Sequence, residues 1–169
     1  MRRFVLGLAL AAMFLSADSG AGVQWTTPAT WKSEAQRAMR LATYSIAPDT
    51  ECGVYYFGSG QGGSVQANLD RWIGQFLQAD GKPSKEAAKI NKRSVHGLPV
   101  TTVDVSGAYT GMGGPTAPSG PAVAGYRMLG AVVEGPQGSI FFKFVGPAKA
   151  VAANQAPFDK MIASLEPVR

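Results

Sequence analysis

The sequence has little of what most catalytic and metal sites are built from. It contains one cysteine and one histidine in 169 residues. A single cysteine excludes an intramolecular disulfide framework, and Cys52 and His96 alone cannot supply the ligand sets of zinc sites. Neither HExxH nor GxSxG occurs, so the metalloprotease and serine-hydrolase patterns are missing. No metal is therefore expected, and the residues of a catalytic triad are not visible.

Long apolar runs are also scarce, and the one present is at the N-terminus. Residues 4–15 (FVLGLALAAMFL) follow Arg2 and Arg3 and precede small residues. This pattern predicts a secretory signal peptide over residues 1–21, with residues 19–21 as the cleavage signal and residues 15–17 as a rival. Twelve apolar residues are too few for a transmembrane span of about 20. We expect a periplasmic or secreted protein without stable membrane insertion, and an uncleaved N-terminal anchor is the alternative.

The remaining 148 residues, 22–169, fit a single domain. Removal of the predicted leader lowers the formal net charge from +5 to +4. The densest basic run, residues 82–93, has no interleaved aromatics, so nucleic acid is not an expected partner. This run is interpreted as a solvated face, with an anionic partner as the alternative. Cys52 shares one face of a predicted strand with Val54 and Tyr56, which indicates a buried thiol.

Alternation and turn signals predict six strands in the domain. Residues 22–33, with Trp25 and Trp31, are expected to be an irregular lead-in that covers an edge of the core. A helix is predicted at 64–77. A closing helix is predicted to start at Pro147 and to restart at Pro157, after which apolar residues recur at helical spacing. Hairpins make the sheet antiparallel, and helices are expected on its faces, which predicts an α+β domain arranged as an α/β/α sandwich. The strands are predicted at 40–46, 53–57, 85–95, 100–106, 126–134 and 139–145.

A glycine-rich loop, GSGQGG at 58–63, leads into the first predicted helix and fits the GxGxxG dinucleotide pattern. The segment after the helix is polar, whereas a central parallel strand would be apolar, and no strand-terminal acid follows at the right spacing. We therefore expect no cofactor here. The glycines are interpreted as a sharp turn, with anion binding at the helix N-terminus as the alternative. Ser64 is expected to cap the helix.

Two segments are candidates for a partner or ligand surface. Asn68, Arg71 and Gln75 lie opposite the apolar stripe of the first helix, so they form either a solvated face or a binding face. Residues 109–125 are rich in Gly, Pro, Ser and Thr, and loops of this length are usually functional or disordered. This segment is either a linker or a binding loop. The candidate residues are Asn68, Arg71, Gln75, Tyr109, Thr110 and Met112.

Several phrases of the sequence together resemble a family of exported bacterial proteins related in fold to the PsbP-like group. That group includes an extrinsic photosystem II subunit and a nuclear Ran-binding protein. The resemblance implies an antiparallel sheet between helices and a role in binding larger assemblies, and it transfers no binding residue. The phrases are Met39-Arg40-x-Ala42-x-Tyr44, Gly62-Gly63-Ser64 with Asn68, Asp70-Arg71-Trp72 and Gln75-Phe76, Gly97 with Val103 to Gly107, and Phe141-Phe142-Lys143 with Gly146-Pro147, Phe158 and Ser164-Leu165.

The sequence therefore predicts an exported, non-catalytic domain that binds a protein partner or a small molecule in the cell envelope. The alternative is a small cell-envelope hydrolase that uses carboxylates, because distant carboxylate pairs are invisible in sequence.

Overall fold

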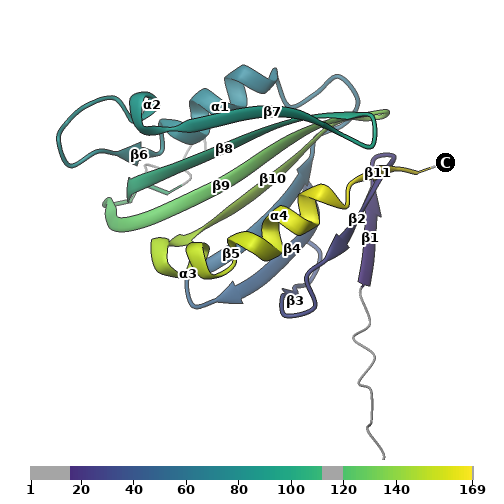
Figure 1. Cartoon of the computed structure of the whole chain (residues 1–169), viewed down its shortest axis with the longest axis horizontal. Coiled ribbons are helices and arrows are strands. Elements are labelled where there is room, and N and C mark those ends of the chain that lie inside the picture. Colours follow the sequence, from purple (N-terminus) through teal and green to yellow (C-terminus); the bar gives the residue numbers. More distant parts are fainter. Residues whose placement is uncertain (1–15, 112–119, 169) are drawn as a thin grey trace, which may run out of the picture.

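The computed structural model of the chain describes residues 16–111 and 120–168 (Figure 1). Within these residues, eight antiparallel strands form one large sheet. In spatial order its strands are β3 (Lys32–Ser33), β4 (Arg40–Ala47), β5 (Thr50–Tyr56), β10 (Gly138–Pro147), β9 (Val123–Gly135), β8 (Leu98–Tyr109) and β6 (Phe76–Leu77), and β7 (Lys89–Val95) also pairs with β8. The α+β class and the mostly antiparallel sheet are as predicted.

A second, three-stranded sheet contains β1 (Ser16–Gly20), β2 (Val23–Thr27) and β11 (Glu166–Pro167). The prediction of an irregular lead-in over 22–33 is therefore wrong for β2, where Val23, Trp25 and Thr27 alternate inward. The prediction overlooked this alternation. β1 lies inside the range predicted as leader, so the folded part of the chain begins before residue 22.

Four helices occur in the described residues: α1 (Val65–Ile73), α2 (Ser84–Ala87), α3 (Ala148–Ala153) and α4 (Gln155–Ala163). Ser64 caps α1 as expected, because its Oγ accepts a hydrogen bond from the Ala67 amide at 3.1 Å. α1 ends at Ile73 with Gly74 as its C-cap, earlier than the predicted residue 77, and Phe76 continues the buried stripe from β6 instead. The strand predicted from residue 85 begins at Lys89, since α2 occupies the preceding residues.

One hairpin connects β7 with β8 and another connects β9 with β10, and each sets the register of its two strands. His96 and Gly97 turn β7 into β8 with positive φ angles of 45° and 84°, as a tight hairpin requires. β9 and β10 meet through residues 135–138 at the predicted turn. These hairpins place β10 near the centre of the sheet, where both of its faces are covered.

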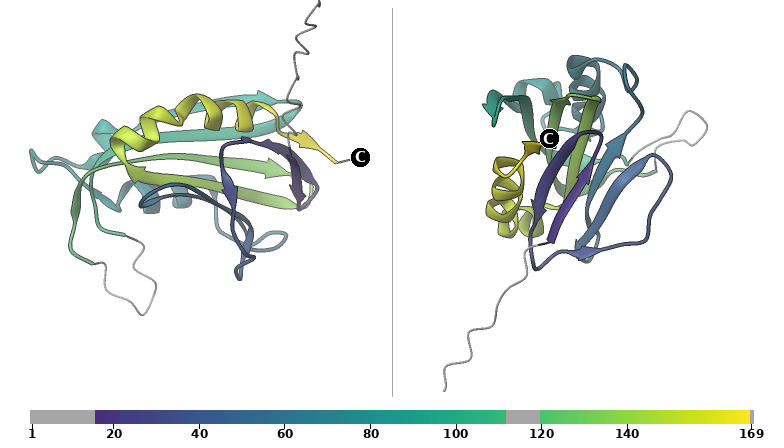
Figure 2. Two further views of the ribbon diagram at one scale, coloured as in Figure 1. Left: turned by 90° about the horizontal axis from the view of Figure 1, so that it is seen from below. Right: turned by 90° about the vertical axis from the view of Figure 1, so that its right-hand side faces the viewer.

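The two faces of the sheet carry separate apolar clusters. On one face, α3, α4 and β2 pack against Tyr44, Cys52 and Phe142. On the other, α1 packs against Phe141 and Val103. Figure 2 shows α4 lying along its face of the sheet, with the β1–β2 hairpin at the end of the molecule. The predicted burial of Cys52 is confirmed. None of the described helices combines the length and apolar character needed to cross a bilayer.

Candidate functional site

A lysine is buried in the middle of the large sheet. Lys143 follows Phe141 on the α1 face of β10 and is only 4% exposed. Its Nζ donates hydrogen bonds to Gln75 Oε1 at 2.6 Å and to the Tyr109 hydroxyl at 3.2 Å. Among the described residues no carboxylate forms an ion pair with it. Buried charges in proteins are usually paired, so this lysine needs an explanation.

Glycines on both neighbouring strands make room for Lys143 and for the rings around it. Lys143 is in register with Gly53 on β5 and with Gly130 on β9. A Cβ at Gly53 would lie 2.7 Å from the Tyr55 ring, and a Cβ at Gly130 would lie 2.7 Å from the Trp72 ring. The two rings therefore lie directly over the glycine backbone on either side of the lysine.

The acceptors of the Lys143 ammonium are held by the pairing of β6 with β8. Phe76 pairs with Tyr109 in this short ladder. The backbone oxygen of Gln75 accepts bonds from the Thr110 amide at 2.9 Å and from its hydroxyl at 3.0 Å. Gln75 and Tyr109, 34 residues apart in the sequence, thus present their side-chain oxygens to the same amine.

Two further polar side chains come from α1. Asn68 is buried, and its Nδ2 donates to the carbonyl oxygens of Gly62 at 2.7 Å and Ser64 at 2.9 Å. Its Oδ1 accepts a hydrogen bond from the Arg71 guanidinium. Asn68 therefore ties the glycine-rich loop to the helix and orients Arg71. We call Asn68, Arg71, Gln75, Tyr109 and Lys143 the Lys143 cluster.

A small cavity of about 50 Å³ opens between Lys143 and α1. Its polar lining comes from Lys143, Arg71 and Asn68, and its apolar lining comes from aromatic rings. No carboxylate from residues 16–111 or 120–168 lines it. The seven lining residues are Tyr55, Phe57, Asn68, Arg71, Trp72, Phe141 and Lys143. We call this space the Lys143 cavity.

The electrostatic environment of Lys143 disfavours its charged form. Burial, together with the nearby charges of Arg71 and Arg40, lowers the pKa of the ammonium to about 7, and Glu51 acts in the opposite direction. Glu51 forms an ion pair with Arg40 at 2.5 Å, so its charge is already compensated. Burial also raises the pKa of Tyr109 to about 12. The site therefore combines the buried amine of Lys143 with the exposed guanidinium of Arg71.

Comparison with known proteins addresses the fold. The solution structure of cyanobacterial PsbP (CyanoP) from Synechocystis sp. PCC 6803 matches over 98% of both chains, with a TM-score of 0.56 and 13% sequence identity. The chain has a PsbP-like fold. The crystal structure of PA94, a protein of unknown function from Pseudomonas aeruginosa, covers 92% of this chain and 98% of its own, with a TM-score of 0.45 and 8% identity. No family model and no curated protein matches the sequence.

The PsbP-like fold brings together residues that the sequence placed on two separate segments. Asn68, Arg71 and Gln75 were expected opposite the apolar stripe of the helix, but Asn68 is buried and Gln75 lies beyond the helix end. Thr110 and Tyr109 lie beside Gln75. Met112 lies outside the described residues.

Sequence analysis missed Lys143, although a signal was available. It is the one charged residue within the apolar run Ile140–Val145, whose residues face covered surfaces on both sides of the sheet. A charged residue at such a position must either be paired or mark a site. Because its neighbours are aromatic, the run was interpreted only as a buried, packed strand.

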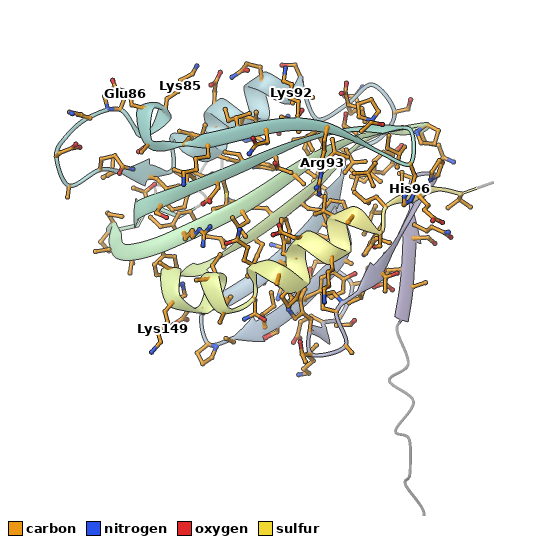
Figure 3. All side chains as sticks on the ribbon, in the orientation of Figure 1. Lys85, Glu86, Lys92, Arg93, His96 and Lys149 are labelled. Atoms are coloured by element: carbon orange, nitrogen blue, oxygen red, sulfur yellow. The ribbon has the colours of Figure 1, made fainter. Side chains whose placement is uncertain are left out.

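A larger hollow of about 670 Å³ lies on the opposite face, between β7, β8, β9 and α4. One of its cations, Arg127, is already held by Asp104 at 2.7 and 2.9 Å and by Gln155 at 2.9 Å. Figure 3 shows Arg93 extending from β7 toward α4, whereas Lys85 and Lys92 point outward at the edge of the molecule. The basic run is thus spread over two sides of β7. We consider this open, solvated surface the weaker candidate.

Proposed function

We propose that this chain is an exported, non-catalytic domain that binds an anionic group of a partner or of a small ligand at the Lys143 cluster. Export is supported by the leader pattern at the N-terminus. A binding role is supported by the site itself, which offers donors and positive charge. The PsbP-like fold is compatible with this function but does not indicate the ligand. The helices covering both faces of the sheet fit the α/β/α sandwich expected from the sequence.

The observation that carries the proposal is the buried ammonium of Lys143. Keeping this amine charged in the sheet costs on the order of 5 kcal/mol relative to water, given its pKa of about 7. An apolar residue at this position would avoid that cost. Buried ions can often be replaced by apolar residues without loss of stability. An anion that enters the cavity recovers part of the same free energy. A binding role therefore explains a residue that stability alone does not.

A thermal-shift experiment tests this function. The wild-type domain is melted at pH 6.5 with sodium salts of several small inorganic and organic anions at constant ionic strength. We expect at least one anion to raise the melting temperature, because a ligand specific to the folded state stabilises it. Lys143→Met should lose this response, and Lys149→Met, which removes an exposed lysine of α3, should keep it. Equal responses of wild type and Lys143→Met to every anion would contradict the proposal.

One observation favours a second function. An amine with a pKa near 7 is partly neutral at physiological pH, and a neutral lysine can attack a carbonyl group to form an imine with loss of water. Reduction with borohydride in the presence of a simple aldehyde would trap such an adduct. A mass increase confined to Lys143 would favour an enzyme over a binding domain. The carboxylate hydrolase expected as the alternative stays a prediction: Asp104 and Asp159 line the larger hollow on the α4 face, where Asp104 forms an ion pair with Arg127.

A further inference from the structure

The donors of the Lys143 cavity determine which groups it can accept. The ammonium of Lys143 has three N–H groups, and two of them already bond to Gln75 and Tyr109. Arg71 lines the cavity and uses one nitrogen on Asn68. The Asn68 amide is fully engaged with Gly62, Ser64 and Arg71. Within the described residues, N–H groups of both cations remain without an acceptor, so acceptor atoms and negative charge on a ligand would complete the site.

The size of the cavity narrows the class of anion. One water needs roughly 10–15 Å³ of such space, so about 50 Å³ holds on the order of three to five heavy atoms. A carboxylate with its adjoining carbon has four heavy atoms and is planar. A phosphate ester has at least six and is tetrahedral. The cavity therefore fits a carboxylate better than a phosphate ester.

The walls of the cavity also favour a carboxylate ligand. Phe57 and Phe141 lie with ring centroids 5.6 Å apart, and Trp72 stands edge-on to Phe141 at 6.4 Å. Such rings exclude water from the sides of a ligand, which strengthens charge-assisted hydrogen bonds at its oxygen atoms. They also provide apolar contact for a carbon adjacent to the charged group.

We propose that the Lys143 cavity binds one carboxylate group, with its oxygen atoms between the Lys143 ammonium and the Arg71 guanidinium. This inference rests on the proposed function and names its ligand class. The carboxylate belongs either to a free organic acid or to the C-terminus of a peptide, since both present the same four atoms. The experiment below separates these two sources.

Binding of a carboxylate is expected to take up a proton on Lys143, because of the groups around this amine. They come from α1, β4, β5 and β8 and are Arg71, Arg40, Glu51, Tyr55 and Tyr109. The arginines stay charged, Glu51 is ion-paired with Arg40, and burial raises the pKa values of Tyr55 and Tyr109. Lys143 is therefore the group whose charge changes between pH 6 and pH 8. Affinity should be constant below its free-state pKa and should fall above it.

Isothermal titration calorimetry tests the inference with sodium propionate, sodium phosphate and sodium chloride at constant ionic strength. We expect propionate to bind about tenfold more weakly at pH 8 than at pH 6, as a proton-linked site with a pKa near 7 requires. At pH 7.5 the heat should depend on the ionisation enthalpy of the buffer, because binding removes a proton from the buffer. Two acetylated tetra-alanine peptides, one with a free C-terminus and one amidated, then test the peptide source.

Three variants give the controls. Lys143→Met should abolish propionate binding, and Arg71→Met should weaken it about tenfold, in line with one charge-assisted hydrogen bond. Lys149→Met should stay within twofold of wild type. Lys143→Met is expected to melt at or above the wild-type temperature, so its loss of binding would not reflect unfolding.

Each outcome of these titrations supports or overturns a different part of the inference. Propionate binding with the expected pH dependence supports the inference, and tighter binding of the free peptide than of the amidated one assigns the source to a chain end. Phosphate binding without propionate binding overturns the carboxylate class and leaves the proposed function standing. Propionate binding without pH or buffer dependence overturns the proton uptake. No binding of any anion at either pH overturns both the inference and the proposed function.

Discussion

The two faces of β10 differ although they are built from alternate residues of one strand. Toward α4 the strand presents Ile140, Phe142 and Phe144, all fully buried among apolar side chains. Toward α1 it presents Phe141, Lys143 and Val145, so a charge replaces the central apolar residue. The α4 face holds the larger cluster, which also takes in β2 and α3. A fold that is stabilised by apolar packing on one face of its sheet can therefore tolerate a costly polar group on the other face.

The largest expected effect lies on the α4 face. Phe142→Ala removes a fully buried ring that meets Trp25 edge-on at 5.3 Å. We expect a loss of about 3–5 kcal/mol in the free energy of unfolding, measured by denaturant titration. A loss below about 1 kcal/mol would show that the α4 face is not the principal source of stability.

On the α1 face, Trp72→Ala should cost about 3 kcal/mol, at the lower end of the range for buried aromatic residues. Trp72 is 3% exposed and lies over Gly130, but its cluster is smaller than the one under α4. Circular dichroism melts of this variant beside Phe142→Ala measure the difference between the faces. Trp72→Ala should also abolish anion binding, because it removes one wall of the Lys143 cavity.

Lys143→Met should increase stability, by about 2 kcal/mol at pH 6. The folded-state pKa of Lys143 is depressed to about 7, so the unfolded chain binds more protons between this pH and about 10.5. Wild-type stability should therefore rise with pH by about 1.4 kcal/mol per unit between pH 7 and pH 9 relative to the variant. The penalty is fully present below pH 7. Urea titrations of both proteins at pH 6, 7, 8 and 9 measure this gap, and a constant gap would contradict the burial argument.

The smallest effect is expected where polar groups enter the α4 face. Asp18 on β1 accepts hydrogen bonds from the Tyr44 and Thr27 hydroxyls, each at 2.6 Å, and Tyr44 also accepts one from the Trp25 indole at 2.9 Å. Asp18→Ala should cost about 1–2 kcal/mol, since it leaves partly buried donors without an acceptor. Thermal melts of this variant beside Ser19→Ala, an exposed neighbour on β1, give the comparison. Equal melting temperatures would show that the network adds no stability.

Local patterns were enough to predict most of the fold. The stripe of Leu69, Trp72 and Ile73 has helical spacing and identified α1, and alternation with turn residues identified the long strands. α2 was missed because its four residues show no apolar periodicity. The end of α1 was placed too late because Phe76 is buried whether it lies in a helix or in β6.

The site was only partly predictable because its contacts span the chain. Gln75 and Tyr109 were each singled out for local reasons, the helix face and the loop. Their convergence depends on the pairing of β6 with β8, which no local pattern encodes. Lys143 lies 68 residues from Gln75, so its hydrogen-bond partners could not be named from the sequence. Residue spacing within one segment predicts which side chains share a face. A site formed by several strands can be predicted only when the register between those strands is known.

The position of Asp18 distinguishes the two cleavage sites that the sequence predicts. A peptidase that cut after Ala21 would remove all of β1, including the carboxylate that bonds to Tyr44 and Thr27. A cut after Ala17 would leave Asp18 as the first residue, with the ladder from Asp18 to Gly20 still paired to β2. Recombinant domains that begin at residue 18 and at residue 22 are thus different proteins. The longer domain keeps β1 at the edge of the small sheet. The shorter domain lacks β1, so this edge has no paired strand.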